Sequence, residues 1–203
     1  SVGSLISLCS GGGDDHDRIW GDSGVDILSG GNHSDFILGG DGNDTITGDD
    51  GDDSIDGESG NDTINGNAGR DTLRGGDGDD AVSGDGDDDS IFGDTGNDTL
   101  NGNDANDALD GGSGIDLLHG NAGDDFLTAG SGVGDLLYGD SGNDHLTGSD
   151  FGGSSDPDFL DANLFGDLLD GGDGDDRIFG LGGADLIYGG NGDDFIDSGA
   201  SAD

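Results

Sequence analysis

A nine-residue period runs through most of this chain and decides what it can fold into. The repeat reads Gly-Gly-x-Gly-x-Asp-x-(aliphatic)-x, and residues 39–47 form a clear copy. Fifteen copies run from 12 to 147 with one extra residue, Gly134, and five more run from 153 to 197. All twenty copies have Asp at the sixth place and an aliphatic residue at the eighth. Such a pattern predicts a stack of similar short units.

The repeat frame also sets the expected boundaries. Residues 1–11 form an N-terminal extension, and residues 12–197 form a single repeat domain. Within that domain, 148–152 is an insertion and 153–170 contains degenerate repeats. Residues 198–203 begin a further copy.

The composition excludes several classes of protein. The chain has 49 Gly, 48 acidic residues, four Arg and no Lys, which gives a formal net charge of −44. Only 28% of residues are hydrophobic, a composition typical of disordered chains, but disorder does not require an aliphatic residue at every ninth place. Nucleic acid is not expected as a partner because no basic patch exists to contact phosphate. No stretch is long and apolar enough to span a bilayer, and the single cysteine, Cys9, excludes an intrachain disulfide.

We expect an all-β fold, a right-handed parallel β-roll (β-solenoid) in which two repeats form one coil of 18 residues. The glycine-rich places one to six form a turn, because glycine adopts positive φ without steric cost. The remaining three residues form a strand whose central aliphatic side chain points inward. Stacking of about ten coils then gives two parallel sheets with the eighth-place side chains between them.

The same stacking predicts metal sites along both edges of the roll. One buried aliphatic side chain per repeat contributes about 2 kcal/mol, less than the entropy lost by ordering nine residues. Metal binding is the missing term, because the sixth-place carboxylates form two columns beside exposed turn carbonyls, and such oxygen ligands suit Ca²⁺. We expect roughly one calcium ion per repeat, with each carboxylate bridging the ions above and below it. The expected ligands are Asp17, Asp26, Asp35, Asp44, Asp53, Asp62, Asp71, Asp80, Asp89, Asp98, Asp107, Asp116, Asp125, Asp135, Asp144, Asp176, Asp185 and Asp194.

The repeats resemble those of the repeats-in-toxin (RTX) family, whose tandem nonapeptides fold as a calcium-loaded parallel β-roll. This resemblance implies that the sixth-place Asp of each copy is a metal ligand. It also implies a secreted, extracellular protein exported by type I secretion. The copies that begin at Gly153 and Ala162 depart from the pattern, so sites at Asp158 and Asp167 are not expected.

The sequence gives no sign of an enzyme. The segments 21–24 and 139–142 mimic the surroundings of a serine-protease nucleophile, but both fall at ordinary turn places of the repeat. The preferred function is a calcium-binding extracellular structural protein that self-assembles end to end as a filament or matrix subunit. The alternative is the C-terminal secretion and folding module of a larger exported enzyme, toxin or adhesin. An ice-binding or polysaccharide-binding module is a further alternative.

Overall fold

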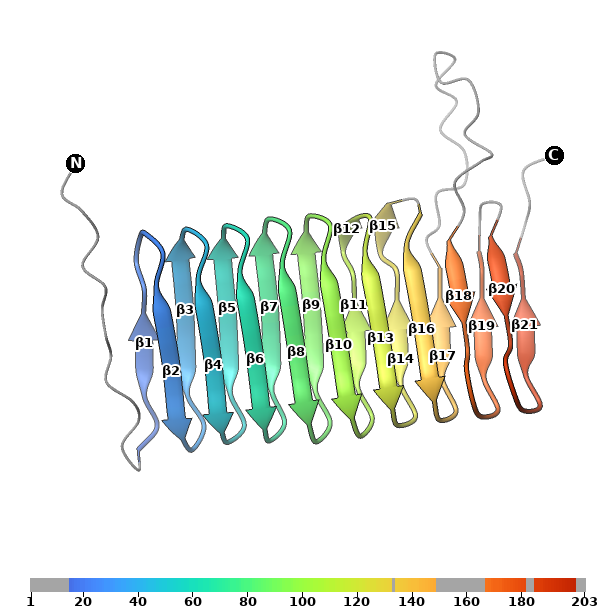
Figure 1. Cartoon of the computed structure of the whole chain (residues 1–203), viewed down its shortest axis with the longest axis horizontal. Coiled ribbons are helices and arrows are strands. Elements are labelled where there is room, and N and C mark those ends of the chain that lie inside the picture. Colours follow the sequence, from blue (N-terminus) through green and yellow to red (C-terminus); the bar gives the residue numbers. More distant parts are fainter. Residues whose placement is uncertain (1–14, 133, 149–166, 182–184, 200–203) are drawn as a thin grey trace, which may run out of the picture.

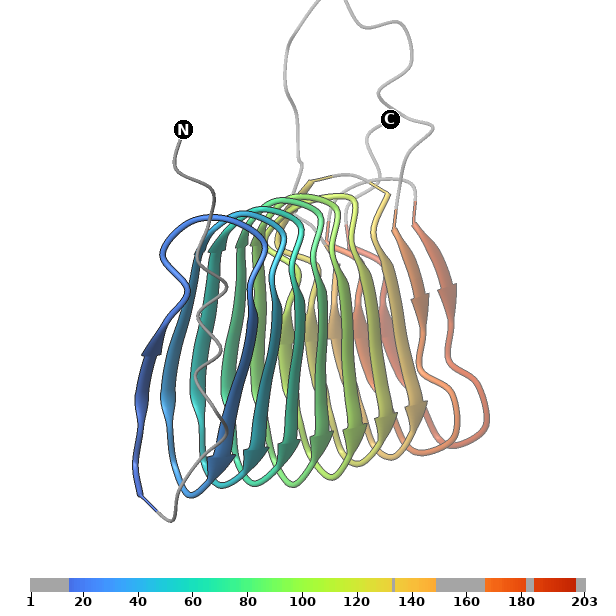
Figure 2. The ribbon, with the colours of Figure 1, turned by 60° about the vertical axis from the view of Figure 1, so that its left-hand side comes forward.

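Two parallel β-sheets lie face to face and form a long flattened rod (Figure 1). The computed structural model describes residues 15–132, 134–148, 167–181 and 185–199. In these ranges every regular element is a strand. The chain alternates between the two sheets, and successive coils keep nearly the same outline along the rod (Figure 2). The predicted fold, an all-β solenoid with parallel strands, is confirmed.

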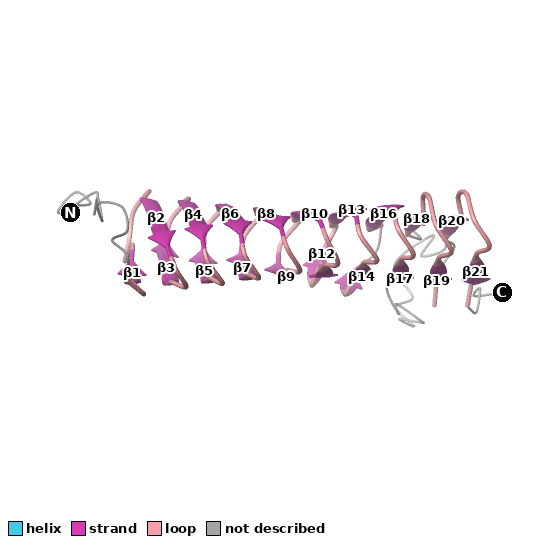
Figure 3. Ribbon diagram, turned by 90° about the horizontal axis from the view of Figure 1, so that it is seen from below, coloured by secondary structure: helices cyan, strands magenta, loops and turns pink. Residues whose placement is uncertain are grey.

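One sheet has twelve strands and the other has nine. The 12-stranded sheet contains β1 (Arg18–Trp20), β3 (Phe36–Asp41), β5 (Ser54–Ser59), β7 (Thr72–Asp77), β9 (Ser90–Thr95), β11 (Ala108–Asp110), β14 (Phe126–Thr128), β17 (His145–Thr147), β19 (Arg177–Phe179) and β21 (Phe195–Asp197), with the short strands β12 (Ser113–Gly114) and β15 (Ser131–Gly132) beside them. The nine-stranded sheet contains β2 (Ile27–Asn32), β4 (Thr45–Asp50), β6 (Thr63–Ala68), β8 (Ala81–Gly86), β10 (Thr99–Asp104), β13 (Leu117–Ala122), β16 (Leu136–Ser141), β18 (Leu168–Asp170) and β20 (Leu186–Tyr188). Seen along the strands, the sheets form two separate layers (Figure 3).

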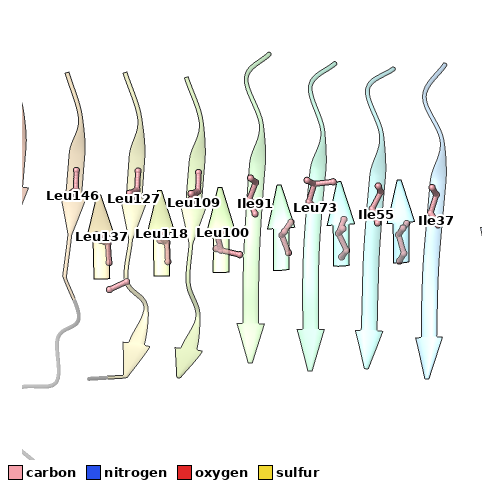
Figure 4. Packing of buried hydrophobic residues seen from close by; sticks show 14 of the residues in the cluster. Ile37, Ile55, Leu73, Ile91, Leu100, Leu109, Leu118, Leu127, Leu137 and Leu146 are labelled. Atoms are coloured by element: carbon pink, nitrogen blue, oxygen red, sulfur yellow. The ribbon is translucent and has the colours of Figure 1, made fainter. Parts of the chain in front are cut away.

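Each strand pairs with the strand eighteen residues away in the regular part of the rod. Ile46, for example, lies opposite Ile64, and Ile64 lies opposite Val82. The eighth-place side chains therefore stack in rows between the sheets, as predicted (Figure 4). Those within the described residues are almost completely buried from Leu28 to Leu146 and at Leu169 and Ile178.

The strands are longer than the sequence predicts. In the middle of the rod they continue through places one to three of the following repeat, as in β4. The second-place residue has a positive φ, 75° at Asp49, which bends the strand without ending the ladder. Asp49 and Asp50 still pair with Asn67 and Ala68 of the next coil. The expectation that places one to six form a turn is wrong here, because only places four to six leave the ladder.

The insertion enters the rod at a different point from the one expected. β16 pairs directly with β18, and β17 pairs directly with β19. Gly148 is packed like a first-place glycine, and its repeat continues at Asp167. The extra residues therefore lie between these two positions, and Asp158 falls outside the described residues. The described repeats provide nineteen core strands, or about nine coils rather than about ten.

Candidate metal sites

The sixth-place aspartates follow the strand ladders into two straight columns, one along each edge of the rod. Every described coil places this residue directly before a strand, so the parallel ladder fixes its height in the stack. The extra residue Gly134 does not interrupt the column, because the N–H of Asp116 still donates to Asp135 Oδ1 at 2.9 Å. Sixteen of these aspartates are at most 4% exposed, which is unusual for an ionisable side chain.

One carboxylate oxygen of each described column aspartate from Asp35 to Asp194 is used to join coils. The backbone N–H of Asp44 donates to Asp62 Oδ1 at 2.7 Å, and that of Asp62 donates to Asp80 Oδ1 at 2.7 Å. The same bond recurs in every described coil, at 2.6 to 3.2 Å. Oδ1 therefore already holds the preceding coil, and the bridging of metal ions by both oxygens stays a prediction.

The second carboxylate oxygen has no hydrogen-bond partner, although it is buried. Such atoms occur at sixteen places of the two columns. They belong to Asp26, Asp35, Asp44, Asp53, Asp62, Asp71, Asp80, Asp89, Asp98, Asp107, Asp116, Asp125, Asp135, Asp144, Asp176 and Asp185. Burying a charged oxygen without a partner costs several kcal/mol, so a regular row of them indicates that something else binds there.

First-place glycines surround these oxygens. A Cβ built on Gly39 would lie 2.7 Å from Asp44 Oδ2 and 2.7 Å from the carbonyl oxygen of Gly57. The free carboxylate oxygen and a backbone carbonyl therefore face the same small space, which only glycine leaves open. The arrangement repeats at the other first-place glycines. A cation fits between two such oxygens, whereas two oxygens alone repel each other.

Burial disfavours the charged form of these carboxylates. The pKa of Asp71 and of Asp89 is raised to about 7, mainly by desolvation and to a smaller extent by the nearby charges of other aspartates. The backbone N–H that each Oδ1 accepts acts in the opposite direction and lowers the pKa. The pKa of Asp62, near the middle of the other column, rises to about 6 for the same reasons. The charged form of these carboxylates is therefore costly in the calcium-free fold, and a bound metal ion would offset that cost.

The structure brings together most of the aspartates chosen from the sequence. Asp17 and Asp194, at the two ends, belong to the same columns but are partly exposed. Asp167, which the sequence analysis rejected, is 2% exposed and accepts the N–H of Asp135 at 3.1 Å. The residues directly before Asp167 do not follow the repeat, which is why this aspartate was not expected as a ligand. The spacing Asp167-x-Leu169 itself matches the repeat.

A scan against protein-family models gives a match over most of the chain. The model of the RTX calcium-binding nonapeptide repeat (4 copies) matches residues 11–46, 29–64, 57–91, 65–100, 83–118, 101–134, 130–150, 152–187 and 170–203. The chain belongs to this RTX repeat family. No curated protein shows a significant match to it.

RTX repeats bind calcium, and the geometry of this chain suits that ion. The free groups at each edge are carboxylate and carbonyl oxygens, the ligands that Ca²⁺ prefers. Among the described residues, no three His, Cys, Asp or Glu side chains converge as a metal-binding group. Backbone carbonyls would therefore supply much of the coordination beside the single free aspartate oxygen. No helix in the described part is long and apolar enough to cross a membrane.

Proposed function

We propose that this chain is an extracellular structural rod in which the sixth-place aspartates hold about one calcium ion per repeat. The row of buried, unpartnered Oδ2 atoms carries the proposal. The proposal also includes Asp167, which is 2% exposed and accepts the N–H of Asp135 in the same column, beside the eighteen ligands expected from the sequence. Bound cations would neutralise most of the formal charge of −44 and supply the cohesion that the thin core lacks.

Replacing one column residue tests the ligand assignment. In Asp80→Asn the amide oxygen can still accept the N–H of Asp62, so the link between coils survives while the charged oxygen is lost. We expect fewer calcium ions per chain in isothermal titration calorimetry and a lower Tm with calcium. Asp88→Asn is the matched control, because Asp88 has the same charge but lies at the exposed fifth place. Equal calcium stoichiometry in the two variants would contradict the assignment.

We also propose that rods join end to end. The bonds from each aspartate N–H to the next Oδ1 all point toward the C-terminal end, although backbone bonds between coils run in both directions. The described rod therefore has unlike ends. At the N-terminal end both oxygens of Asp26 lack a partner. At the other end Ile196 is 45% exposed, and within the described residues β21 pairs only with β19. A donor end that meets an acceptor end produces an open, head-to-tail assembly.

The same ends favour a second candidate, a calcium-folded module of a larger exported protein. In that case further coils of the same polypeptide would cover the exposed core at Ile196. Electron microscopy of the chain with and without calcium separates the two. Filaments many rods long support end-to-end assembly, whereas single rods at high protein concentration with calcium support the module.

A further inference from the structure

The seventh and ninth places of the 12-stranded sheet carry equal numbers of positive and negative charges, although the chain has a formal net charge of −44. We call this surface the outer face; it comprises the seventh- and ninth-place residues of its ten core strands. Three arginines on it balance three aspartates. These residues are Arg18, Arg74, Arg177, Asp56, Asp110 and Asp197. Acidic residues at places one to three of the same strands lie beside this face, so it is less acidic than the edges but has a charged border.

Aromatic and aliphatic side chains form two patches on the outer face. The N-terminal patch contains Trp20, Phe36 and Leu38, of which Trp20 is 49% and Phe36 is 40% exposed. The C-terminal patch contains Phe126, Phe179 and Phe195. In the C-terminal patch, His145 stacks between Phe126 and Phe179, with ring centroids at 4.8 and 5.2 Å. Exposed apolar clusters of this kind indicate contact surfaces.

The two patches carry opposite charges at the ends of the sheet. Arg18 accompanies the N-terminal patch on β1, and Asp197 accompanies the C-terminal patch on β21. From this arrangement we propose that two copies of the chain pair through their outer faces, with the rods antiparallel. The two-fold axis would run along the strand direction, so that β1 of one copy faces β21 of the other.

This pairing matches groups along the sheet. With full overlap of the ten core strands, β3 faces the partner's β19, which places Phe36 opposite an arginine and Leu38 opposite a phenylalanine. β5 faces the partner's β17, where Asp56 lies opposite a threonine and diagonal to a histidine. At the end, Trp20 lies opposite the aspartate of the partner's last strand, and Arg18 lies diagonal to that aspartate. Each contact occurs twice, as a two-fold interface requires.

The alternative two-fold axis, along the rod, fits less well. It would place each strand opposite the same strand of the other copy, so Arg18 would face the partner's β1. Arg18 and Asp197 would then lie at opposite ends of the assembly. The antiparallel pairing is therefore the one in which the charges attract.

The outer face together with its acidic rim is large enough for a specific dimer. Ten strands at about 4.8 Å spacing and a width of roughly 15–20 Å, which includes places one to three of the following repeat, bury roughly 700–1,000 Å² on each copy. Specific interfaces bury about 800 Å² per partner. The acids beside this surface, such as Glu58 and Asp94, form a polar rim, and Arg74 already pairs with Asp94 at 3.0 Å. A neutral apolar centre with a charged rim is the usual anatomy of a protein interface.

A charge exchange tests the pairing directly. Analytical ultracentrifugation of the calcium-loaded chain should show a dimer whose Kd lies in the roughly micromolar range. Arg18→Asp alone and Asp197→Arg alone should each weaken it by roughly tenfold, because like charges then face each other. The double variant restores the opposite charges and should recover most of the affinity. Phe179→Ser should weaken the dimer without any change of charge.

Matched controls keep the result specific. Thr63→Asp with Asn65→Arg makes a similar change on the outward face of the nine-stranded sheet and should leave the dimer intact. Circular dichroism with calcium verifies that each variant folds. Trp20 is the sole tryptophan, so its fluorescence should shift to the red as dilution separates the copies.

Three results would overturn the proposal. The first is a wild-type rod that stays monomeric at millimolar concentration. The second is a double variant no tighter than its single parents. The third is Trp20 fluorescence that is blue-shifted at every concentration, which would show that another segment of the same chain covers the N-terminal patch.

Discussion

The middle coils and the last coils are built from the same repeat but differ in how completely they are covered. β4 to β10 are six-residue strands, and their core residues, such as Leu73 and Ile91, are fully buried. β18 to β21 are three-residue strands, and exposure of the core rises to 45% at Ile196. The carboxylates follow the same trend, since Asp89 is buried whereas Asp194 is partly exposed.

Neighbouring coils therefore determine both how much free energy a repeat gains from burying its aliphatic side chain and how much it loses by burying its carboxylate. A coil covered on both sides buries its aliphatic side chain fully, but it also removes its aspartate from water. A coil at the end of the rod buries less apolar surface, and the desolvation cost of its carboxylate is smaller. Stability in such stacks is a sum over nearest neighbours, so the middle coils should depend most on bound cations.

Removal of calcium should have the largest effect. In low-salt buffer at pH 7.5, stripping the ions should abolish the sheet signal in circular dichroism and expand the chain in small-angle scattering, because buried charges lose their partners. Hydrogen exchange should show the largest loss of protection in β5 to β9. A calcium-free sample that kept its sheet signal and compact radius would refute the role of calcium in cohesion.

Acidification should act next, and in opposite directions with and without calcium. In the calcium-free fold, burial raises the pKa of Asp71, Asp80 and Asp107 from 3.8 to about 7. Their contribution to stability is therefore complete below about pH 4 and is lost as the pH rises through 6 to 7. We expect the calcium-free chain to gain sheet structure between pH 7.5 and 4.5, and the calcium-loaded chain to lose ions as protons compete. A calcium-free chain that lost structure on acidification would contradict this prediction.

A large-to-small substitution in the core should lower the free energy of unfolding more in a middle coil than in the last coil. Ile91→Ala removes a side chain that is 0% exposed and should lower the free energy of unfolding by about 2–5 kcal/mol. Ile196→Ala removes one that is 45% exposed, so its cost should be less than about 1 kcal/mol. Denaturant titrations with saturating calcium give both values. Equal costs would show that the last coil is covered in solution, for instance by an end-to-end contact.

Two glycine substitutions should give the smallest changes in stability. They compare a glycine with no room for a Cβ with a glycine that has room for one. A Cβ on Gly39 would enter the space between Asp44 Oδ2 and the Gly57 carbonyl, so Gly39→Ala should cost about 1–3 kcal/mol and weaken one calcium site. At Gly86 the nearest atom to a Cβ is 3.6 Å away, so Gly86→Ala should change stability by less than about 1 kcal/mol. Thermal melts with calcium compare the two. If the two variants had the same Tm, the absence of a side chain at the first place would not be needed for the metal site.

The period alone predicts the coil, the core and the two columns. The aliphatic side chain at the eighth place can be buried only between the two sheets, and Ile46 lies there. The sixth-place Asp precedes each strand, so it stacks on the Asp of the next coil, as Asp44 does on Asp62. The length of the strands could not be predicted in this way. At the second place Asp49 adopts positive φ and remains in the ladder, a conformation fixed by pairing with the neighbouring coil rather than by local preference.

The end of the insertion could not be predicted for a similar reason. Asp158-x-Leu160 and Asp167-x-Leu169 both satisfy the repeat, so the local sequence offers two places at which the coil could resume. Pairing of β18 with β16 selects Asp167. The hydrogen bond from each aspartate N–H to the next Oδ1 was also missed, because it joins residues eighteen apart and leaves no trace in composition.

The orientation of the ladders governs how the rod would respond to force. β1 and β21 lie at opposite ends, and the hydrogen bonds between coils run along the line that joins them (Figure 1). Tension between the ends pulls these bonds along their own direction, so they need not rupture together as they would in shear. Each detached coil releases about 60 Å of extended chain, compared with about 4.8 Å of rod. The molecule should therefore lengthen in steps under load and shorten again as coils rewind, like a spring whose stiffness is set by the calcium around it.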